Sequence, residues 1–214
     1  MKVGLLSESP ADEAALRILL EALLGESVSV VQPPLRARGW PNVSQVLGPI
    51  LWHLQFRTDA EALVVCVDAD DSTVHEGDHG DPDAFHPKCR LCLLEMVIRK
   101  TRKRWKLPEG RRPLHTAVAL AVPAVEGWYL AGRDPEVGEA TWRADQAAGH
   151  HRYTRRDLKI RVYGTRRPTL EFETRRAQEE ARRLAKDIAL LETLFPVGFG
   201  YFARCVREWR REER

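Results

Sequence analysis

Two carboxylates directly follow an apolar stretch of the chain. The run Leu63–Val67 is apolar throughout, which predicts a strand buried on both faces of a parallel sheet. Asp68 and Asp70 follow it two residues apart, so an extended backbone would present both on one side. Open α/β sheets bind ligands at this carboxyl end of their strands. The pattern indicates a site for Mg²⁺ or Mn²⁺, and a solvated turn is the alternative.

Three further carboxylates are expected at the same edge of the sheet. Glu8 follows a predicted strand over 2–7, and Asp12 lies in the first turn of a predicted helix over 10–24. Glu126 opens a short predicted helix after a strand over 115–122. As the alternative, Asp12 and Glu126 only complement the dipoles of their helices. Glu8 has no capping duty at a strand end, so a functional role is favoured for it.

Histidines and cysteines gather after the Asp pair. His75, His79 and His86 precede Cys89 and Cys92, and this composition invites a zinc interpretation. However, the two cysteines fall inside an apparent helix that reaches about residue 105, and they form a single C-x-x-C pair. We therefore expect core thiols and a mobile loop over the site rather than bound zinc.

The end of that helix is basic. Its cations surround Trp105 and could follow phosphates while the ring stacks on a base; they include Arg99, Lys100, Arg102 and Lys103. A solvated helix end that complements the dipole is an equally good explanation. Residues 151–214 hold 17 Lys and Arg against 10 Asp and Glu, within a net charge of +3. An acidic site facing a polyanion would have this asymmetry, although an Arg-rich helical face would too.

The order of elements predicts an α/β fold with an open, mainly parallel four-stranded sheet flanked by helices. The expected strands are 2–7, 28–32, 63–67 and 115–122. Helices are expected over 10–24, 42–57 (kinked or split at Gly48-Pro49), 89–105, 123–131, 157–164 and 171–194, with a last one after Pro196. Residues 132–153 are expected to be irregular. We divide the chain into an α/β domain, 1–131, and a basic helical C-terminal part, 132–214, packed on the same unit.

Composition sets broad limits. The 214 residues are 43% hydrophobic and 30% charged, which suits a globular protein of one domain with an appendage. We see no apolar run near the roughly 20 residues of a membrane span and no signal-peptide pattern. Four cysteines do not suggest a disulfide framework. We expect a cytoplasmic protein with no membrane partner.

The whole pattern resembles the Toprim family, the catalytic fold of topoisomerases, primases and the overcoming-lysogenization-defect nucleases. Toprim domains carry a Glu after the first strand and a D-x-D after the third, matched here by Glu8 and Asp68-Ala69-Asp70. Asp12 matches an acidic residue of the nuclease branch. The stretches VEGWYLA, DLKIRVYG and FPVGFGYFARCVREW resemble small stand-alone bacterial Toprim proteins. In one departure, Ser9-Pro10 replaces the glycine that usually follows the first Glu.

The resemblance implies a nuclease that uses two divalent cations, Mg²⁺ or Mn²⁺, to hydrolyse phosphodiester bonds of DNA or RNA. Asp68, Asp70 and Glu126 would bind metal, Asp12 would serve a second metal, and Glu8 would be a ligand or a general acid/base. His75, His79, Lys88 and Arg90 would contact the scissile phosphate. No GxxxxGK[ST] loop is present, so an ATPase partner in anti-phage defence would be a separate chain. The alternatives are a non-catalytic binding subunit, favoured by Ser9-Pro10, and phosphoryl transfer on a small nucleotide.

Overall fold

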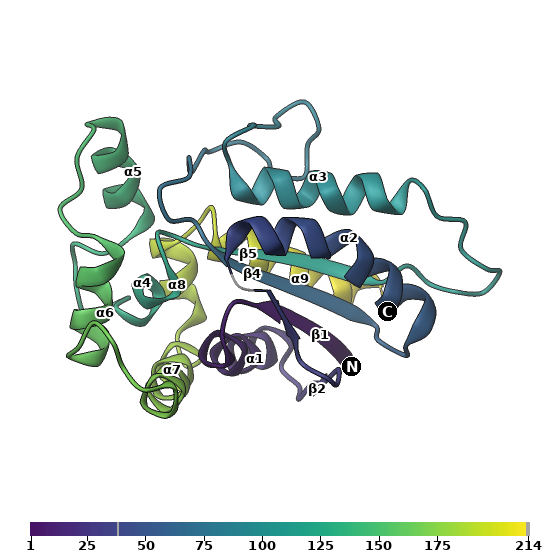
Figure 1. The fold of residues 1–214 in the computed structure, drawn as a ribbon, viewed down its shortest axis with the longest axis horizontal. Coiled ribbons are helices and arrows are strands. Elements are labelled where there is room, and N and C mark those ends of the chain that lie inside the picture. Colours follow the sequence, from purple (N-terminus) through teal and green to yellow (C-terminus); the bar gives the residue numbers. More distant parts are fainter. Residues whose placement is uncertain (38, 213–214) are drawn as a thin grey trace.

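A parallel β-sheet forms the centre of the molecule. The computed structural model describes residues 1–37 and 39–212, and its sheet has five strands in the order β2-β1-β4-β5, with β3 also paired to β1 (Figure 1). All pairs are parallel. The strands are β1 (Lys2–Ser7), β2 (Ser29–Val30), β3 (Leu35–Arg36), β4 (Ala62–Asp68) and β5 (His115–Ala121). The α/β class and the parallel open sheet are thus confirmed.

The sheet differs from the prediction at its β1 edge. The strand expected over 28–32 is reduced to β2, and the chain pairs with β1 a second time after Pro33-Pro34, where Leu6 faces Leu35. Four predicted strands therefore become five. A strand of two residues carries no periodicity of its own, because only its partner defines it.

Helices cover both faces of the sheet and bury its central strand. All seven residues of β4 are buried, as expected for an apolar run between two helical layers. Four helices provide the layers: α2 and α3 on one face, α1 and α9 on the other (Figure 1). Their bounds are α1 (Pro10–Leu24), α2 (Trp40–Arg57), α3 (Arg90–Arg102) and α9 (Phe199–Glu212).

Local signals set the ends of α1. The Ser9 side chain accepts a hydrogen bond from the Asp12 amide, Pro10 occupies the first turn, and Gly25 ends the helix at φ 71°. These are the residues that favour a helix start and a left-handed end. By contrast, α2 continues through Pro49, so the predicted division at Gly48-Pro49 is wrong.

Five more helices lie between β5 and α9, the first before residue 132 and the other four in the C-terminal part. They are α4 (Val125–Tyr129), α5 (Glu139–Ala147), α6 (Arg155–Tyr163), α7 (Leu170–Leu184) and α8 (Ile188–Leu194). Helix α5 lies in the segment predicted to be irregular. The single helix predicted over 171–194 is two helices, because the Asp187 side chain accepts from the Leu190 amide 3.1 Å away and caps α8.

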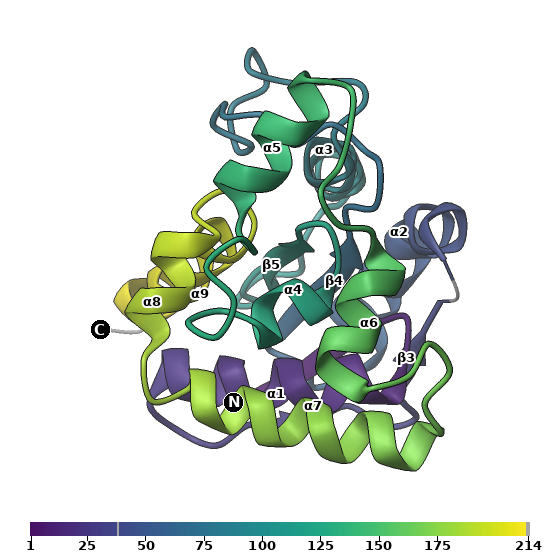
Figure 2. The ribbon, with the colours of Figure 1, turned by 90° about the vertical axis from the view of Figure 1, so that its left-hand side faces the viewer.

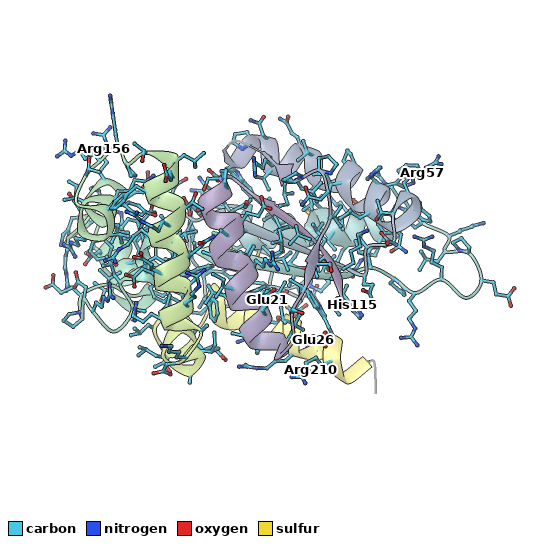
Figure 3. All side chains as sticks on the ribbon, turned by 90° about the horizontal axis from the view of Figure 1, so that it is seen from below. Glu21, Glu26, Arg57, His115, Arg156 and Arg210 are labelled. Atoms are coloured by element: carbon cyan, nitrogen blue, oxygen red, sulfur yellow. The ribbon has the colours of Figure 1, made fainter. Side chains whose placement is uncertain are left out.

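These helices pack on the sheet domain. Helix α7 lies alongside α1 (Figures 2 and 3), while α4, α5 and α6 gather at the carboxyl ends of the strands. The chain therefore adds its helical part to the edge where the carboxylates were predicted. None of the helices within residues 1–37 and 39–212 has the length and hydropathy needed to cross a membrane.

Candidate functional site

Five carboxylates predicted from the sequence lie around the carboxyl ends of β1, β4 and β5. We call them the carboxylate edge: Glu8, Asp12, Asp68, Asp70 and Glu126. Strand β4 pairs with β1 on one side and β5 on the other, so the residues that follow these strands become neighbours. Their charges interact, since Glu126, Asp12 and Glu8 all raise the pKa of Asp68.

Asp68 is the most deeply placed member of the edge. It is 6% exposed, and its Oδ1 accepts a hydrogen bond of 3.1 Å from the Val125 amide. Its Oδ2 forms an ion pair with Arg155 of α6. Burial raises the pKa of Asp68 well above its usual value, and the Arg155 charge opposes that rise. The carboxylate is thus tied to both α4 and α6.

Asp70 lies between two arginines. Its Oδ2 is 2.8 Å from Arg90 Nη1, and its Oδ1 is 2.9 Å from Arg155 Nη1. Arg90 also donates to the Asp68 carbonyl at 2.6 Å and lies over the Trp40 ring. Asp70 has φ 45°, a left-handed conformation that aspartate tolerates better than most residues. This turn lets one side chain meet cations from two helices.

The other three carboxylates form the rest of the edge. Glu126 is 5% exposed, and its Oε1 lies 3.5 Å from Lys159 Nζ. Burial raises the pKa of Glu126 despite that lysine. Burial also raises the pKa of Glu8, and it raises the pKa of Asp12 to about 7. Asp12 can therefore hold a proton near neutral pH.

Two open grooves flank Asp70 and share it as a lining residue. The groove of about 590 Å³ is bordered by α2 and α3 and includes Trp40, Lys88 and Arg90. The groove of about 350 Å³ on the other side is bordered by Trp142, Tyr153, Arg155 and Arg156. Each groove combines aromatic rings, cations and the Asp70 carboxylate.

The predicted basic residues divide into two sets. Lys88 and Arg90 line the groove beside Asp70. The remaining four are in the last turns of α3, and the rise of about 1.5 Å per residue places Arg99 roughly 14 Å along the axis from Arg90. Arg102 donates to Thr116 Oγ1 at 3.0 Å on β5. Arg99, Lys100 and Lys103 instead line a separate pocket.

The prediction of Mg²⁺ or Mn²⁺ without zinc is wrong. Within the described chain, the side chains that could share one metal ion are His75, His79, Cys89 and Cys92, whose donor atoms lie within 4.8 Å of one another. We call these four residues the His/Cys cluster. Nitrogen and sulfur donors are the zinc type, whereas Mg²⁺ and Mn²⁺ prefer oxygen. The carboxylate edge does not form such a group among these residues, and its oxygens contact Arg90, Arg155 and Lys159 instead.

The sequence interpretation placed Cys89 and Cys92 inside a helix, and this led to the error. Helix α3 begins at Arg90, so Cys89 precedes its first turn and Cys92 lies within that turn. Residues three apart at a helix start lie on one face. His86 is outside the cluster and stacks on His75, with ring centroids 5.4 Å apart. The histidines predicted to contact phosphate thus face cysteines.

Sequence reasoning missed Arg155 and Lys159, the cations that pair with the edge. It also missed the aromatic lining from Trp142 and Tyr153. The available signal was the pattern of Thr154 and Asp157, which form a capping box and start α6. That pattern predicts a helix at Arg155 but does not say which carboxylates it meets.

The departure from the Toprim pattern has a local explanation. Ser9 has φ −141°, an extended conformation open to any residue. Its side chain caps α1 by accepting from the Asp12 amide at 3.1 Å. Serine therefore fits this turn without the freedom of glycine.

Comparison with known proteins adds no relative, since no family model, no curated protein and no solved structure matches the chain.

Proposed function

We propose that the chain is a nuclease that hydrolyses nucleic-acid phosphodiester bonds at the carboxylate edge. The observation that carries this proposal is the position of Asp70. Its backbone is in the left-handed conformation, and its side chain lies between Arg90 and Arg155 where two open grooves meet. Guanidinium groups recognise phosphate as readily as carboxylate. A phosphodiester would bind by taking the place of Asp70 on these arginines. We assign no metal ion to this edge.

The neighbouring carboxylates supply the proton transfers that hydrolysis requires. A general acid or base works best with a pKa near the operating pH, and burial brings the pKa of Asp12 to about 7. Burial raises the pKa of Glu8 as well. Displaced from the arginines, Asp70 would orient the attacking water. Clustered carboxyls with raised pKa values are typical of catalytic sites.

The shape of the site favours a polymer over a small nucleotide. The two grooves continue on both sides of Asp70 rather than closing around it. Trp40 offers a ring near the Arg90 cation in the first groove, the combination that binds single strands. In the second groove His151 stacks on the buried Trp142, and Arg155 and Arg156 lie beside them. The Toprim resemblance further motivates a separate ATPase partner in anti-phage defence, which we include as part of the proposal.

A non-catalytic nucleic-acid-binding subunit is the second candidate. Arg155 pairs with both Asp68 and Asp70, and a permanently neutralised pair would leave the edge inert. The grooves and their cations would then bind a strand without cutting it.

Cleavage of supercoiled plasmid and of total RNA tests these two candidates. The protein would be assayed with and without added divalent cations, and with any ATPase found encoded beside its gene plus ATP. Asp70→Asn and Glu8→Gln should each reduce cleavage by about 100-fold or more. The matched control is Asp59→Asn, a carboxylate paired with Lys2 at the opposite end of the sheet, which should leave cleavage unchanged.

The outcomes separate the candidates. Cleavage that survives both edge substitutions would place any nuclease activity elsewhere. If wild type binds either nucleic acid but cuts neither in any condition, the subunit proposal replaces the nuclease. A protein that neither binds nor cuts would refute both.

A further inference from the structure

The His/Cys cluster joins the loop after β4 to the start of α3. His79 Nδ1 lies 3.4 Å from Cys92 Sγ and 3.8 Å from Cys89 Sγ. His75 approaches Cys92 Sγ with Nε2 at 3.5 Å and Nδ1 at 3.9 Å. Each sulfur therefore faces an imidazole nitrogen, and the four side chains surround one point.

These separations match the edges of a zinc tetrahedron. With Zn–S near 2.3 Å and Zn–N near 2.0–2.1 Å, tetrahedral angles place sulfur and nitrogen about 3.6 Å apart. The observed distances of 3.4–3.9 Å scatter around that value. Hydrogen bonding between thiols and imidazoles alone does not require all four donors to converge.

The surroundings of the cluster suit a metal ion better than free thiols and imidazoles. Cys89, Cys92 and His79 are 0%, 1% and 2% exposed. The Nε2 atom of His79 is buried without a hydrogen-bond partner, while its Nδ1 faces only the two sulfurs. Among the residues that the structure describes, no carbonyl, carboxylate or hydroxyl therefore engages Nδ1, and this nitrogen is available to bind a metal together with the two sulfurs.

His75 has the outer contact expected of a ligand. Its Nε2 lies 3.2 Å from the Ala84 carbonyl, so Nε2–H can donate there and leave Nδ1 free for a metal. Metal-binding histidines nearly always orient their second nitrogen in this way. Gly77 makes room for the ring, because a Cβ atom there would lie 2.9 Å from His75 Nε2.

We propose that the cluster binds one Zn²⁺ as a closed, four-coordinate structural site. Four protein donors complete the tetrahedron and leave no position for a substrate, which distinguishes structural from catalytic zinc. The two halves have spacings common in zinc sites, H-x₃-H and C-x₂-C, in reversed order along the chain. The inference goes beyond the nuclease proposal and does not depend on it.

The proposed zinc ion explains how a long irregular segment holds its shape. Residues 69–89 between β4 and α3 contain no helix or strand, and irregular loops of this length are uncommon in compact domains unless they have a function. A zinc ion would link the middle of this segment to its C-terminal end. Arg90, directly after Cys89, would then be fixed where it meets Asp68 and Asp70.

Metal content of the purified full-length protein tests the proposal directly. Wild type grown with zinc and passed through a desalting column should retain about one zinc ion per chain. Replacement by Co²⁺ should give the visible absorption of a tetrahedral site together with thiolate charge-transfer bands. Cys92→Ser and His79→Ala should each lower retained zinc at least 10-fold. Cys205 is a free cysteine outside the cluster. Cys205→Ser is therefore the matched control, and this variant should retain zinc fully.

The measurement on wild type does not depend on whether a variant folds. Wild type without bound zinc, or with Co²⁺ in an octahedral spectrum, would overturn the proposal. A Cys89–Cys92 disulfide in the freshly purified protein would also overturn it in favour of a redox pair. Equal zinc retention by folded Cys92→Ser and Cys205→Ser would show that zinc binds elsewhere. Because none of these readouts is cleavage, a failure here is distinct from a failure of the nuclease proposal.

Discussion

The carboxylate edge and the His/Cys cluster meet at the start of α3, but they differ in whether their polar side chains have partners of opposite charge within the chain. At the edge, Asp68, Asp70 and Glu126 have cationic partners within the chain, from Arg90, Arg155 and Lys159. In the cluster, His79 meets only cysteines through Nδ1 and has no partner at Nε2. The comparison teaches that the edge pairs its charges with cations of the chain, whereas the cluster gathers nitrogen and sulfur donors of the kind that zinc binds.

Chelation should produce the largest difference between the two regions. Stripping zinc with a strong chelator should lower the free energy of unfolding by about 4 kcal/mol, the contribution of a ligand present at roughly 1,000 times its dissociation constant. Urea unfolding of zinc-loaded and chelated protein measures this loss. Asp70→Asn is the control and should lose the same amount, because the edge does not hold the zinc. A chelator effect that disappears in Asp70→Asn would contradict the separation of the two regions.

Arg155→Met should have the next largest effect, because it removes the partner of a buried carboxylate. Leaving the buried Asp68 carboxylate without its cation should cost about 2 kcal/mol, less than for a fully buried ion pair because the Arg155 side chain is 40% exposed. Arg156→Met is the matched control: Arg156 is the next residue of α6, exposed and at the periphery of the molecule (Figure 3). Chemical denaturation of both variants gives the comparison.

A second substitution checks the cause. Adding Asp68→Asn to Arg155→Met should recover part of the lost stability, because a neutral amide is less costly to bury than an unpaired carboxylate. If the two arginine variants are equally stable, or if Asp68→Asn gives no recovery, internal pairing does not hold the edge together.

The pH dependence of stability should reveal Asp12. Burial raises its pKa from 3.8 to about 7, so the folded chain binds this proton more tightly than the unfolded chain. Its contribution is complete below about pH 4 and is lost as the pH rises through 7, with a slope approaching about 1.4 kcal/mol per pH unit for one proton. Asp12→Asn should remove that slope. The measurement is the difference in unfolding free energy between wild type and variant from pH 4 to 8, and a flat difference would contradict it.

Local sequence signals predicted the parts of the fold that local chemistry determines. Leu63–Val67 indicated β4 because a strand buried on both faces must be apolar throughout. Ser9, Pro10 and Gly25 predicted α1 at the bounds the structure gives. Strand β3 could not be predicted in this way, because its two residues are a strand only through their pairing with β1.

Long-range contacts determined what the sequence did not predict. Arg155 meets Asp70 across 85 positions of sequence, and no spacing rule connects residues so far apart. Helix α5 is fixed by its buried Glu139, which accepts from the Val197 and Gly198 amides at 2.7 and 2.6 Å. These hydrogen bonds join residues far apart in the sequence, so the segment rich in glycine and charge shows no local pattern that predicts the helix.

Part of the His/Cys cluster could be predicted from the sequence. The spacing H-x₃-H from His75 to His79 was present beside C-x₂-C, and both occur in zinc sites. The helical pattern through Cys89 and Cys92 predicts core thiols rather than zinc ligands, and that prediction is wrong. The pattern should have counted in favour of zinc, since a helix start brings positions three apart onto one face.

The smallest expected effect tests the turn that leads from β1 into the edge. Ser9→Ala should cost about 1 kcal/mol, because it removes the hydrogen bond that the Asp12 amide donates to Ser9 Oγ. Ser9→Gly should cost only a few tenths of a kcal/mol, since glycine is a tolerable cap. Thermal unfolding of the two variants side by side makes the comparison. No loss in Ser9→Ala would mean that the serine hydroxyl does not hold this turn, and a larger loss in Ser9→Gly than in Ser9→Ala would mean that chain flexibility, rather than capping, limits the placement of Glu8.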